Sequence, residues 1–176
     1  MSEIKEGLEG VAIGTSEITY IDGMEGQLIF RGHWVEDLAI KYSFEQVAYL
    51  LLFGEIPDPA ELATFSKSMA DARQLPEWVY LMLDLVPDEA SYMAALRTAI
   101  SAMPVAVKHY PPEKEEAIRL IARAPVVLAY LFNKRNDQQF VGPDPTLGHV
   151  ENYLYMLAGE RPSLEKVKLL ETYLVL

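Results

Sequence analysis

The sequence predicts an all-α domain that carries one small β-hairpin near its N-terminus. Apolar residues recur at helical spacing through most of the chain from residue 34 onward, in segments that glycine and proline separate. The stretch 16–32 differs, because it sets short apolar pairs on either side of a glycine-rich turn. The 176 residues suit one domain, and a hydrophobic content of 51% is enough to bury a sizeable core.

The predicted hairpin has the sequence SEITYIDGMEGQLIFRG, residues 16–32. Its turn, DGMEG, is built from residue types that favour tight turns. We expect Asp22 to shape this turn through its side-chain oxygen, and turn formation explains the two glycines without any further function.

Helical segments follow the hairpin, and start or stop signals bound most of them. They are expected, in chain order, at 34–42, 44–54, 59–74, 77–86, 90–103, 112–135, 149–159 and 163–176. The stretch 136–148, NDQQFVGPDPTLG, predicts a loop. The sequence shows no repeat period, low-complexity tract or interdomain linker.

Capping residues support the helices that follow residue 43. Ser43 is a suitable N-cap, and the helix that it starts should end near Gly54. Asp58 should cap the next helix with Pro59 at the first helical position, and Pro76 should open the one after it.

The segment 112–135 is the longest predicted helix. It ends in Lys134 and Arg135, and the helix dipole favours cations at a C-terminus. Pro125 lies inside it, so we expect a kink or a local break at that position.

The final helix, 163–176, has an N-cap at Ser163 and no stop signal. Its last four residues, YLVL, become steadily more apolar. We therefore expect further chain to follow in the complete protein, and we expect the exposed apolar end to make the isolated chain prone to aggregate.

Composition restricts the class of partner and the compartment. The formal net charge of -11 disfavours nucleic acid and anionic membranes, which are themselves polyanions, although a local basic pocket could still take a small anion. The chain has no cysteine, which excludes disulfides and thiolate chemistry and fits a reducing compartment. The start lacks a signal-peptide pattern and no apolar stretch is long enough to span a bilayer, so we expect a cytoplasmic protein.

Motifs that carry chemistry are few. The histidines His33, His109 and His149 lie in separate segments without metal-ligand spacing, so we predict no metal site. Glycine-rich phosphate loops and the nucleophile elbow are missing as well. We therefore assign no catalytic, cofactor-binding or metal-binding residue in this chain.

Two arginines have alternative interpretations. Arg31, Gly32 and His33 could form an anion-binding loop, whereas the structural alternative pairs Arg31 with a nearby acid and uses the glycine to leave the strand. Arg97 could be catalytic, but a buried arginine that is paired is favoured, because buried charges are paired.

Other polar and aromatic residues are expected to be structural. His149 opens a helix, where its imidazole could act as a cap or face solvent. The acidic residues Glu113, Glu115 and Glu116 should form a solvated first helical turn. Tyr49 and Phe53 should lie in the core, because they belong to an apolar helical stripe.

Several stretches resemble the N-terminal half of citrate synthases, including the 2-methylcitrate synthase branch. They are, in family order, GLEGVAIGTSEITYIDGMEGQLIFRGHWVEDLA, SFEQVAYLLLFGEIPDPAELATF, ALRTAISAM, EEAIRLIARAPVVLAY and GHVENYLYMLAGERPS. The resemblance covers essentially the whole chain, and it departs from the family pattern only in the connection 103–113. It implies that residues 1–176 form part of the large helical domain of such an enzyme.

The resemblance also implies what this chain lacks. In the family, the helix that matches 163–176 runs into a histidine-containing segment that binds oxaloacetate. The catalytic histidines and aspartate, most of the acetyl-CoA site and the small domain come later still. The complete enzyme condenses acetyl-CoA with oxaloacetate in the tricarboxylic acid cycle, whereas this chain alone should be an inactive scaffold, and its sequence does not distinguish acetyl-CoA from propionyl-CoA.

Two functional interpretations are left open. The chain could be a fragment of a citrate synthase, or it could be a stand-alone, non-enzymatic helical module that binds a partner. The resemblance implies a homodimer through the alanine-rich helices 90–103 and 112–135, because an isologous interface buries an apolar patch against its own copy. The alternative is that those alanines pack inside one subunit.

Overall fold

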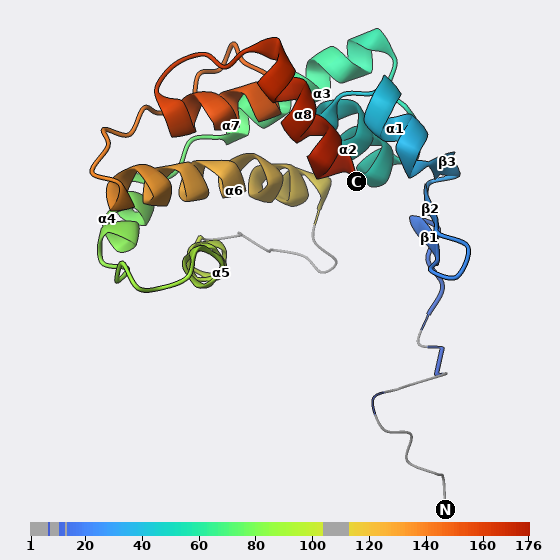
Figure 1. The fold of residues 1–176 in the computed structure, drawn as a ribbon, viewed down its shortest axis with the longest axis horizontal. Helices are drawn as coiled ribbons and strands as arrows, with labels where there is room; N and C mark the ends of the chain where they lie inside the picture. The colour runs from blue at the N-terminus through green and yellow to red at the C-terminus, as the bar shows by residue number, and fades with distance from the viewer. Residues whose placement is uncertain (1–6, 8–10, 13, 104–112) are drawn as a thin grey trace, which may run out of the picture.

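Eight helices and one small antiparallel sheet make up the part of the chain that the computed structural model describes, namely Gly7 and residues 11–12, 14–103 and 113–176. The strands are β1 (Thr19–Asp22), β2 (Gln27–Phe30) and β3 (His33–Trp34). The helices are α1 (Val35–Lys41), α2 (Phe44–Phe53), α3 (Pro59–Ala72), α4 (Glu77–Asp84), α5 (Tyr92–Ala102), α6 (Lys114–Arg135), α7 (His149–Ala158) and α8 (Leu164–Val175). This architecture confirms the predicted fold class, and Figure 1 shows the sheet set to one side of the helices.

The sheet confirms the predicted hairpin and extends it. β1 and β2 pair antiparallel, and the Asp22 carboxylate accepts hydrogen bonds from the backbone N–H groups of Met24 and Glu25 at 2.9 and 3.1 Å, as predicted for the turn. β3, which we did not predict, pairs with β2 on the opposite side from β1. The sheet order is therefore β1-β2-β3.

The predicted capping residues lie where the sequence places them. Ser43 forms a capping box with Gln46, and Gly54 ends α2 in the left-handed conformation with a φ of 99°. At the start of α3, the Asp58 carboxylate accepts hydrogen bonds from two backbone N–H groups, and the Glu61 carboxylate accepts one from the backbone N–H of Asp58. These contacts satisfy N–H groups that an uncapped helix leaves free.

The long helix α6 runs without a break through Pro125, so the local break that we allowed for is absent. Val126 and Val127 directly after the proline are fully buried, and this packing holds the helix together across the missing backbone N–H. At the end of α6 the Lys134 ammonium donates to carbonyl oxygens at the end of α4, the nearest being that of Asp84 at 2.8 Å. The unusual connection 103–113 and His109 lie outside the described residues, apart from Met103 and Glu113 at its ends.

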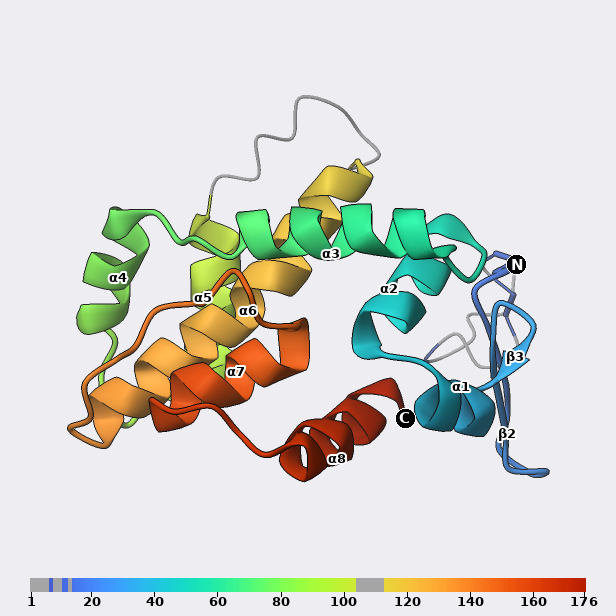
Figure 2. The same ribbon diagram turned by 90° about the horizontal axis from the view of Figure 1, so that it is seen from above.

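Three apolar clusters hold the helices together. The largest joins α4, α5, α6 and α7, a second joins α1 and α2 with Val175 of α8, and a third joins α2, α3 and α6. Figure 2 shows α3 lying alongside α2 and α6, and α8 lying beside α1 and α7. The longest helix, α6, contributes to two of the three clusters.

Four of the alanines of α5 and α6 pack in the interior of this chain. Ala95, Ala99, Ala122 and Ala129 are almost completely buried within it. Their small side chains let α5 and α6 pack together, as the contact between these helices shows. For these four residues, the structure agrees with the alternative that the alanines pack inside one subunit.

Candidate functional site

A cluster of buried polar side chains joins α2, the end of α3 and the start of α7. Its members are Glu45, Arg73, His149 and Asn152, all of which have less than a tenth of their surface exposed. The Glu45 carboxylate accepts a hydrogen bond from the backbone N–H of His149 at 2.6 Å. Gly148 precedes that N–H, and a Cβ at Gly148 would lie 3.3 Å from the same carboxylate oxygen. The close approach of α2 to α7 therefore favours glycine at position 148.

Arg73 is the cation of this cluster and has only 2% of its surface exposed. One of its terminal nitrogens donates to the backbone carbonyl of Asp144 at 2.9 Å, while its Nε has no hydrogen-bond partner. Burial lowers the pKa of Arg73, and the nearby carboxylates of Glu45 and Asp144 oppose that effect. Asn152 completes the cluster by accepting a hydrogen bond from the backbone N–H of Asp144.

His149 is buried, so the prediction that it could face solvent is wrong. Its ring stacks on Phe44 with a centroid separation of 4.6 Å. Burial, with a smaller contribution from the charge of Arg73, lowers the pKa of His149 to about 4. The imidazole is therefore neutral at neutral pH and serves to pack α7 against α2.

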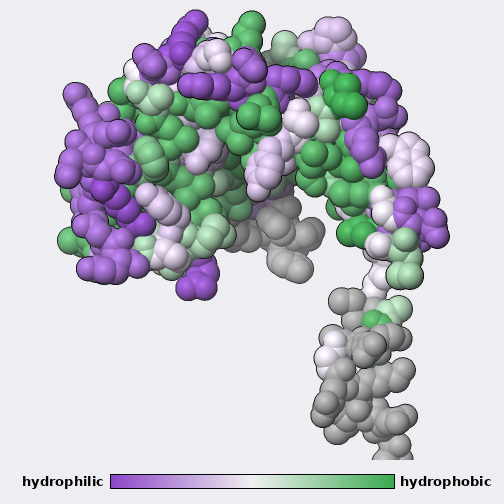
Figure 3. All heavy atoms as spheres, in the orientation of Figure 1, coloured by the Kyte–Doolittle hydropathy of each residue, from purple (hydrophilic) through white to green (hydrophobic). Residues whose placement is uncertain are grey.

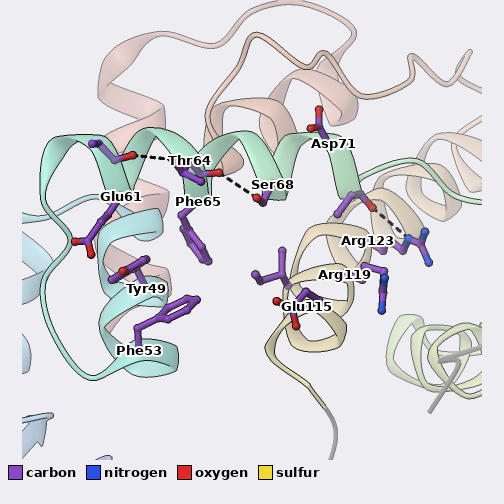
Figure 4. Close-up of a pocket in the computed structure, with 13 residues that line it drawn as sticks. Tyr49, Phe53, Glu61, Thr64, Phe65, Ser68, Asp71, Glu115, Arg119 and Arg123 are labelled. Atoms are coloured by element: carbon purple, nitrogen blue, oxygen red, sulfur yellow. Dashed lines mark hydrogen bonds between the residues drawn. The ribbon is translucent and has the colours of Figure 1, made fainter. Parts of the chain in front are cut away.

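A groove of about 790 Å³ lies between α2, α3 and α6. Figure 4 shows Tyr49 and Phe53 of α2 and Phe65 of α3 pointing into it, opposite Arg119 and Arg123 of α6. Tyr49 and Phe53 stack at 4.3 Å, and Phe65 meets Tyr49 edge to face. The groove is thus lined by aromatic rings on one side and by charged side chains of both signs, Glu115, Arg119 and Arg123, on the other.

Polar groups in this groove are largely used by the fold itself. The Arg123 Nε donates to the carbonyl of Ala72, and the hydroxyls of Thr64 and Ser68 donate to carbonyls one turn earlier in α3, as the dashed lines in Figure 4 show. Glu61 caps α3. The described residues of the groove therefore hold no nucleophile paired with a base, and their arrangement fits packing better than catalysis.

Gly32 provides the exit from β2 with a left-handed φ of 85°, as the structural alternative for this segment expected. Arg31 itself adopts a left-handed φ of 48°, and its guanidinium donates to the backbone carbonyl of Leu51 at 3.2 Å, with no acidic partner among the described residues. His33 is exposed in β3. Arg31 therefore ties the sheet to α2, and its partner is a backbone oxygen that the sequence gave no means to identify.

Three other predictions need correction. Arg97 is exposed and not buried, because α5 packs on its neighbours through Ala95 and Ala99 and turns Arg97 to the outside. Glu116 is buried and not solvated, because its carboxylate accepts a hydrogen bond from the backbone N–H of Glu113 in a capping box. Phe53 is partly exposed, since it lines the groove, whereas its neighbour Tyr49 is buried as predicted.

Two further features concern metal ligands and membrane-spanning helices in the described part of the chain. Within it, no group of three or more histidine, aspartate or glutamate side chains is placed to hold a metal ion. Within the same residues, no helix has both the length and the apolar character needed to cross a bilayer.

The fold is that of solved citrate synthases. The structure of the Thermotoga maritima citrate synthase superposes with a TM-score of 0.87 at 38% identity, over 98% of this chain and 46% of that one. A ternary complex of the Thermoplasma acidophilum citrate synthase with carboxymethyl coenzyme A and oxaloacetate superposes with a TM-score of 0.89 at 26% identity, over 98% of this chain and 47% of that one.

Sequence comparison gives the same class. The protein-family model described as "Citrate synthase, C-terminal domain" matches residues 7–176, and the chain belongs to the citrate synthase family. The citrate synthase of Haloferax volcanii is 41% identical over 170 residues, which are 92% of this chain and 45% of the relative. A 2-methylcitrate synthase of Mycobacterium tuberculosis is 34% identical over 180 residues, 99% of this chain and 45% of the relative. The chain thus spans about half the length of the curated relatives that it matches.

Proposed function

We propose that this chain forms the N-terminal part of the large helical domain of a citrate synthase, and that it acts as scaffold within the complete enzyme. The proposal rests on one observation: the family match covers nearly all of this chain, but this chain covers less than half of its relatives. The family match extends over residues 7–176, while the same residues account for only 45% of the Haloferax volcanii enzyme. The groups that perform the chemistry would then come from the other part of the fold.

The polar side chains of this chain are consistent with a scaffold. Glu45, Arg73 and Asn152 are buried and engaged with backbone groups, and His149 is neutral at neutral pH. General acid–base catalysis needs a group that can reach the substrate and exchange protons near neutral pH. None of these four residues meets both conditions, so we expect the isolated chain to be inactive.

The complete enzyme would condense acetyl-CoA with oxaloacetate. A base removes a proton from the acetyl methyl group, the enol attacks the ketone of oxaloacetate, and water cleaves the thioester to release citrate and CoA. The residues that we describe would support this reaction indirectly, because a rigid helical body keeps the catalytic groups of the remaining fold in position.

A second substrate pair deserves equal testing. The Mycobacterium tuberculosis relative is a 2-methylcitrate synthase, and the Bacillus subtilis relative, 29% identical, is described as a citrate/2-methylcitrate synthase. Propionyl-CoA therefore competes with acetyl-CoA as the proposed acyl donor, and the two are distinguished by assay.

The complete enzyme would be a homodimer whose two subunits contact each other through α5 and α6. The outer face of α5 supports this, since a groove of about 640 Å³ runs along it between Met93, Leu96, Arg97 and Ile100. Met93 is largely exposed there. The alternative is a stand-alone module of the family that uses the same surfaces to bind another protein.

The test is a chimaera in which this chain replaces the matched segment of the Thermotoga maritima citrate synthase. The chimaera should release CoA from acetyl-CoA or propionyl-CoA in the presence of oxaloacetate, whereas the isolated chain should stay at the buffer rate. Turnover by the isolated chain, or a folded chimaera that is inactive with both acyl donors, would contradict the proposal.

A further inference from the structure

A buried cation that no acid contacts lies between the end of α3 and the start of α7. Figure 3 shows hydrophilic residues mainly along the upper and left edges of the molecule, where water can hydrate their charges. Arg73, by contrast, has only 2% of its surface exposed. Among the described residues its one hydrogen bond goes to the backbone carbonyl of Asp144, and none of the ion pairs includes it.

This state is uncommon for an arginine, because buried charges are normally paired and hydrogen-bonded. A guanidinium has five N–H donors, and the Nε of Arg73 has no partner. The carboxylates of Glu45 and Asp144 are close enough to act on the charge of Arg73, but neither forms a direct ion pair with it. Arg73 therefore has donors left for a further acceptor.

A cavity of about 410 Å³ lies beside this cation. Arg73 and Glu45 both line it, together with Ser66 of α3 and Gly148, the N-cap of α7. A water molecule takes up about 30 Å³ of the liquid, so the cavity has room for a small molecule of several heavy atoms. Gly148 has no side chain to cap α7, and Glu45 satisfies only the first N–H of that helix.

The charges in the cavity select the chemistry of a ligand. Arg73 and the N-terminus of α7 both favour an oxyanion. The Glu45 carboxylate repels an oxyanion unless the ligand donates a proton to it. One oxygen of Glu45 accepts from the N–H of His149, and its other oxygen accepts no hydrogen bond from the described residues. Lys67 and Asp71 line the cavity as well, but they pair with each other and leave the balance of charge unchanged.

We propose that this cavity binds a small oxyanion that carries its own proton, with hydrogen phosphate as the simplest member of the class. The charged oxygens of the ligand accept hydrogen bonds from Arg73, and its O–H donates to the free oxygen of Glu45. The bound ion would then link α2, the end of α3 and the start of α7. The proposal does not depend on the proposed function, because it uses only residues of this chain.

The experiment is a calorimetric titration of this chain with inorganic phosphate, sulfate and methyl phosphate at one ionic strength. At about pH 8 inorganic phosphate keeps one O–H, whereas sulfate has none and a phosphate monoester has lost its second proton, which leaves at about pH 6. Binding is measured and not melting temperature, because phosphate and sulfate also stabilise folded proteins by exclusion from their surface.

Inorganic phosphate should bind saturably. Sulfate and methyl phosphate should each bind at least about tenfold more weakly, since each would set an oxygen without a proton against Glu45. The methyl phosphate titration also separates free phosphate from phosphate carried on a larger molecule. The absence of saturable phosphate binding, or equal binding of the three anions, overturns the proposal.

Two variants assign the roles of the side chains. In Glu45→Gln the amide oxygen can still accept from the N–H of His149, while the amide N–H₂ places a donor where the free carboxylate oxygen was. Sulfate should therefore bind this variant at least about tenfold more tightly than it binds the parent, and the preference for phosphate should be lost. A purely structural role of Glu45 would not change the selectivity between anions.

Arg73→Gln removes the cation and should weaken phosphate binding at least about tenfold. Arg97→Gln, at an exposed arginine of α5, is the matched control and should bind phosphate as the parent does. Circular dichroism shows whether each variant is folded, and the selectivity of Glu45→Gln decides alone if Arg73→Gln does not fold. Unchanged selectivity in Glu45→Gln, or unchanged phosphate affinity in folded Arg73→Gln, overturns the assignment of the site.

Discussion

The carboxylate of Glu45 accepts a hydrogen bond from the backbone N–H of His149, 104 positions further along the chain, at 2.6 Å. The contact satisfies a free N–H at the start of α7 and places a negative charge near that helix N-terminus. It also brings a carboxylate toward the buried cation of Arg73. The Glu45 side chain of α2 therefore interacts with both the start of α7 and the cation at the end of α3.

Removal of this carboxylate should destabilise the fold strongly. Glu45→Ala leaves the N–H of His149 without a partner and removes one of the two carboxylates near the charge of Arg73, and we expect a loss of about 3 kcal/mol in the free energy of unfolding. Denaturant titration followed by circular dichroism measures this. Glu36→Ala, which removes an exposed carboxylate from the first turn of α1, is the control and should cost less than about 0.5 kcal/mol. Equal losses in the two variants would show that the Glu45 contact contributes little.

The free energy of unfolding should decrease when the pH is lowered, because of His149. Its pKa in the folded chain is about 4, below the ordinary value of 6.5, so between these two values the unfolded chain binds a proton that the folded chain excludes. The free energy of unfolding should therefore decrease as the pH is lowered from 6.5 to 4, with a contribution from this group of up to about 1.4 kcal/mol per pH unit.

Comparison of two histidine variants isolates that contribution. His149→Gln should flatten the dependence of stability on pH in this window, whereas His33→Gln, at an exposed position, should leave it unchanged. Unfolding curves at several pH values provide the measurement. A His149→Gln profile with the same slope as the parent would refute the assignment.

Short sequence motifs were sufficient to predict the helix N-caps and the turn of the hairpin. Ser43, Asp58 and Asp22 act on backbone groups two or three residues away, so their roles follow from short motifs. The contact between Glu45 and His149 depends on how two helices come together, and no short-range pattern reports that. The polar cluster was therefore missed, although Glu45 is in the first turn of a well-predicted helix.

The error at Arg97 has a different cause. Helix α5 carries apolar residues on more than one side, including Met93, Leu96 and Ile100 as well as its alanines, so the sequence does not define which side is buried. Contact with α6 through Ala99 decides the question and leaves Arg97 outside. A helical pattern identifies the element, whereas the orientation of an evenly apolar helix is fixed by its neighbours.

Two asparagines near the end of α6 should differ in their importance. Both donate a side-chain hydrogen bond to a backbone carbonyl four residues earlier, but Asn133 is buried and also donates to the carbonyl of Met156 in α7 at 2.9 Å, whereas Asn136 is exposed. Asn133→Ala should lower the free energy of unfolding by about 2 kcal/mol, because it breaks the link between helices and opens a buried gap. Asn136→Ala should cost less than about 0.5 kcal/mol by the same measurement. The idea fails if the two variants unfold at the same denaturant concentration.

Self-association should depend on the outer face of α5. Met93 is exposed beside the groove that runs along this helix, and a glutamate at its position would bury a charge twice in a proposed isologous contact, once from each subunit. Met93→Glu should therefore shift the protein from dimer to monomer in sedimentation velocity, with at least about a tenfold weaker dimer. Ile40→Glu on α1, at an equally exposed apolar position, is the control and should leave the dimer intact. A parent chain that sediments as a monomer at all concentrations, or a Met93→Glu dimer as tight as that of the parent, would remove α5 as the interface and leave the alanines of α5 and α6 with a purely internal role.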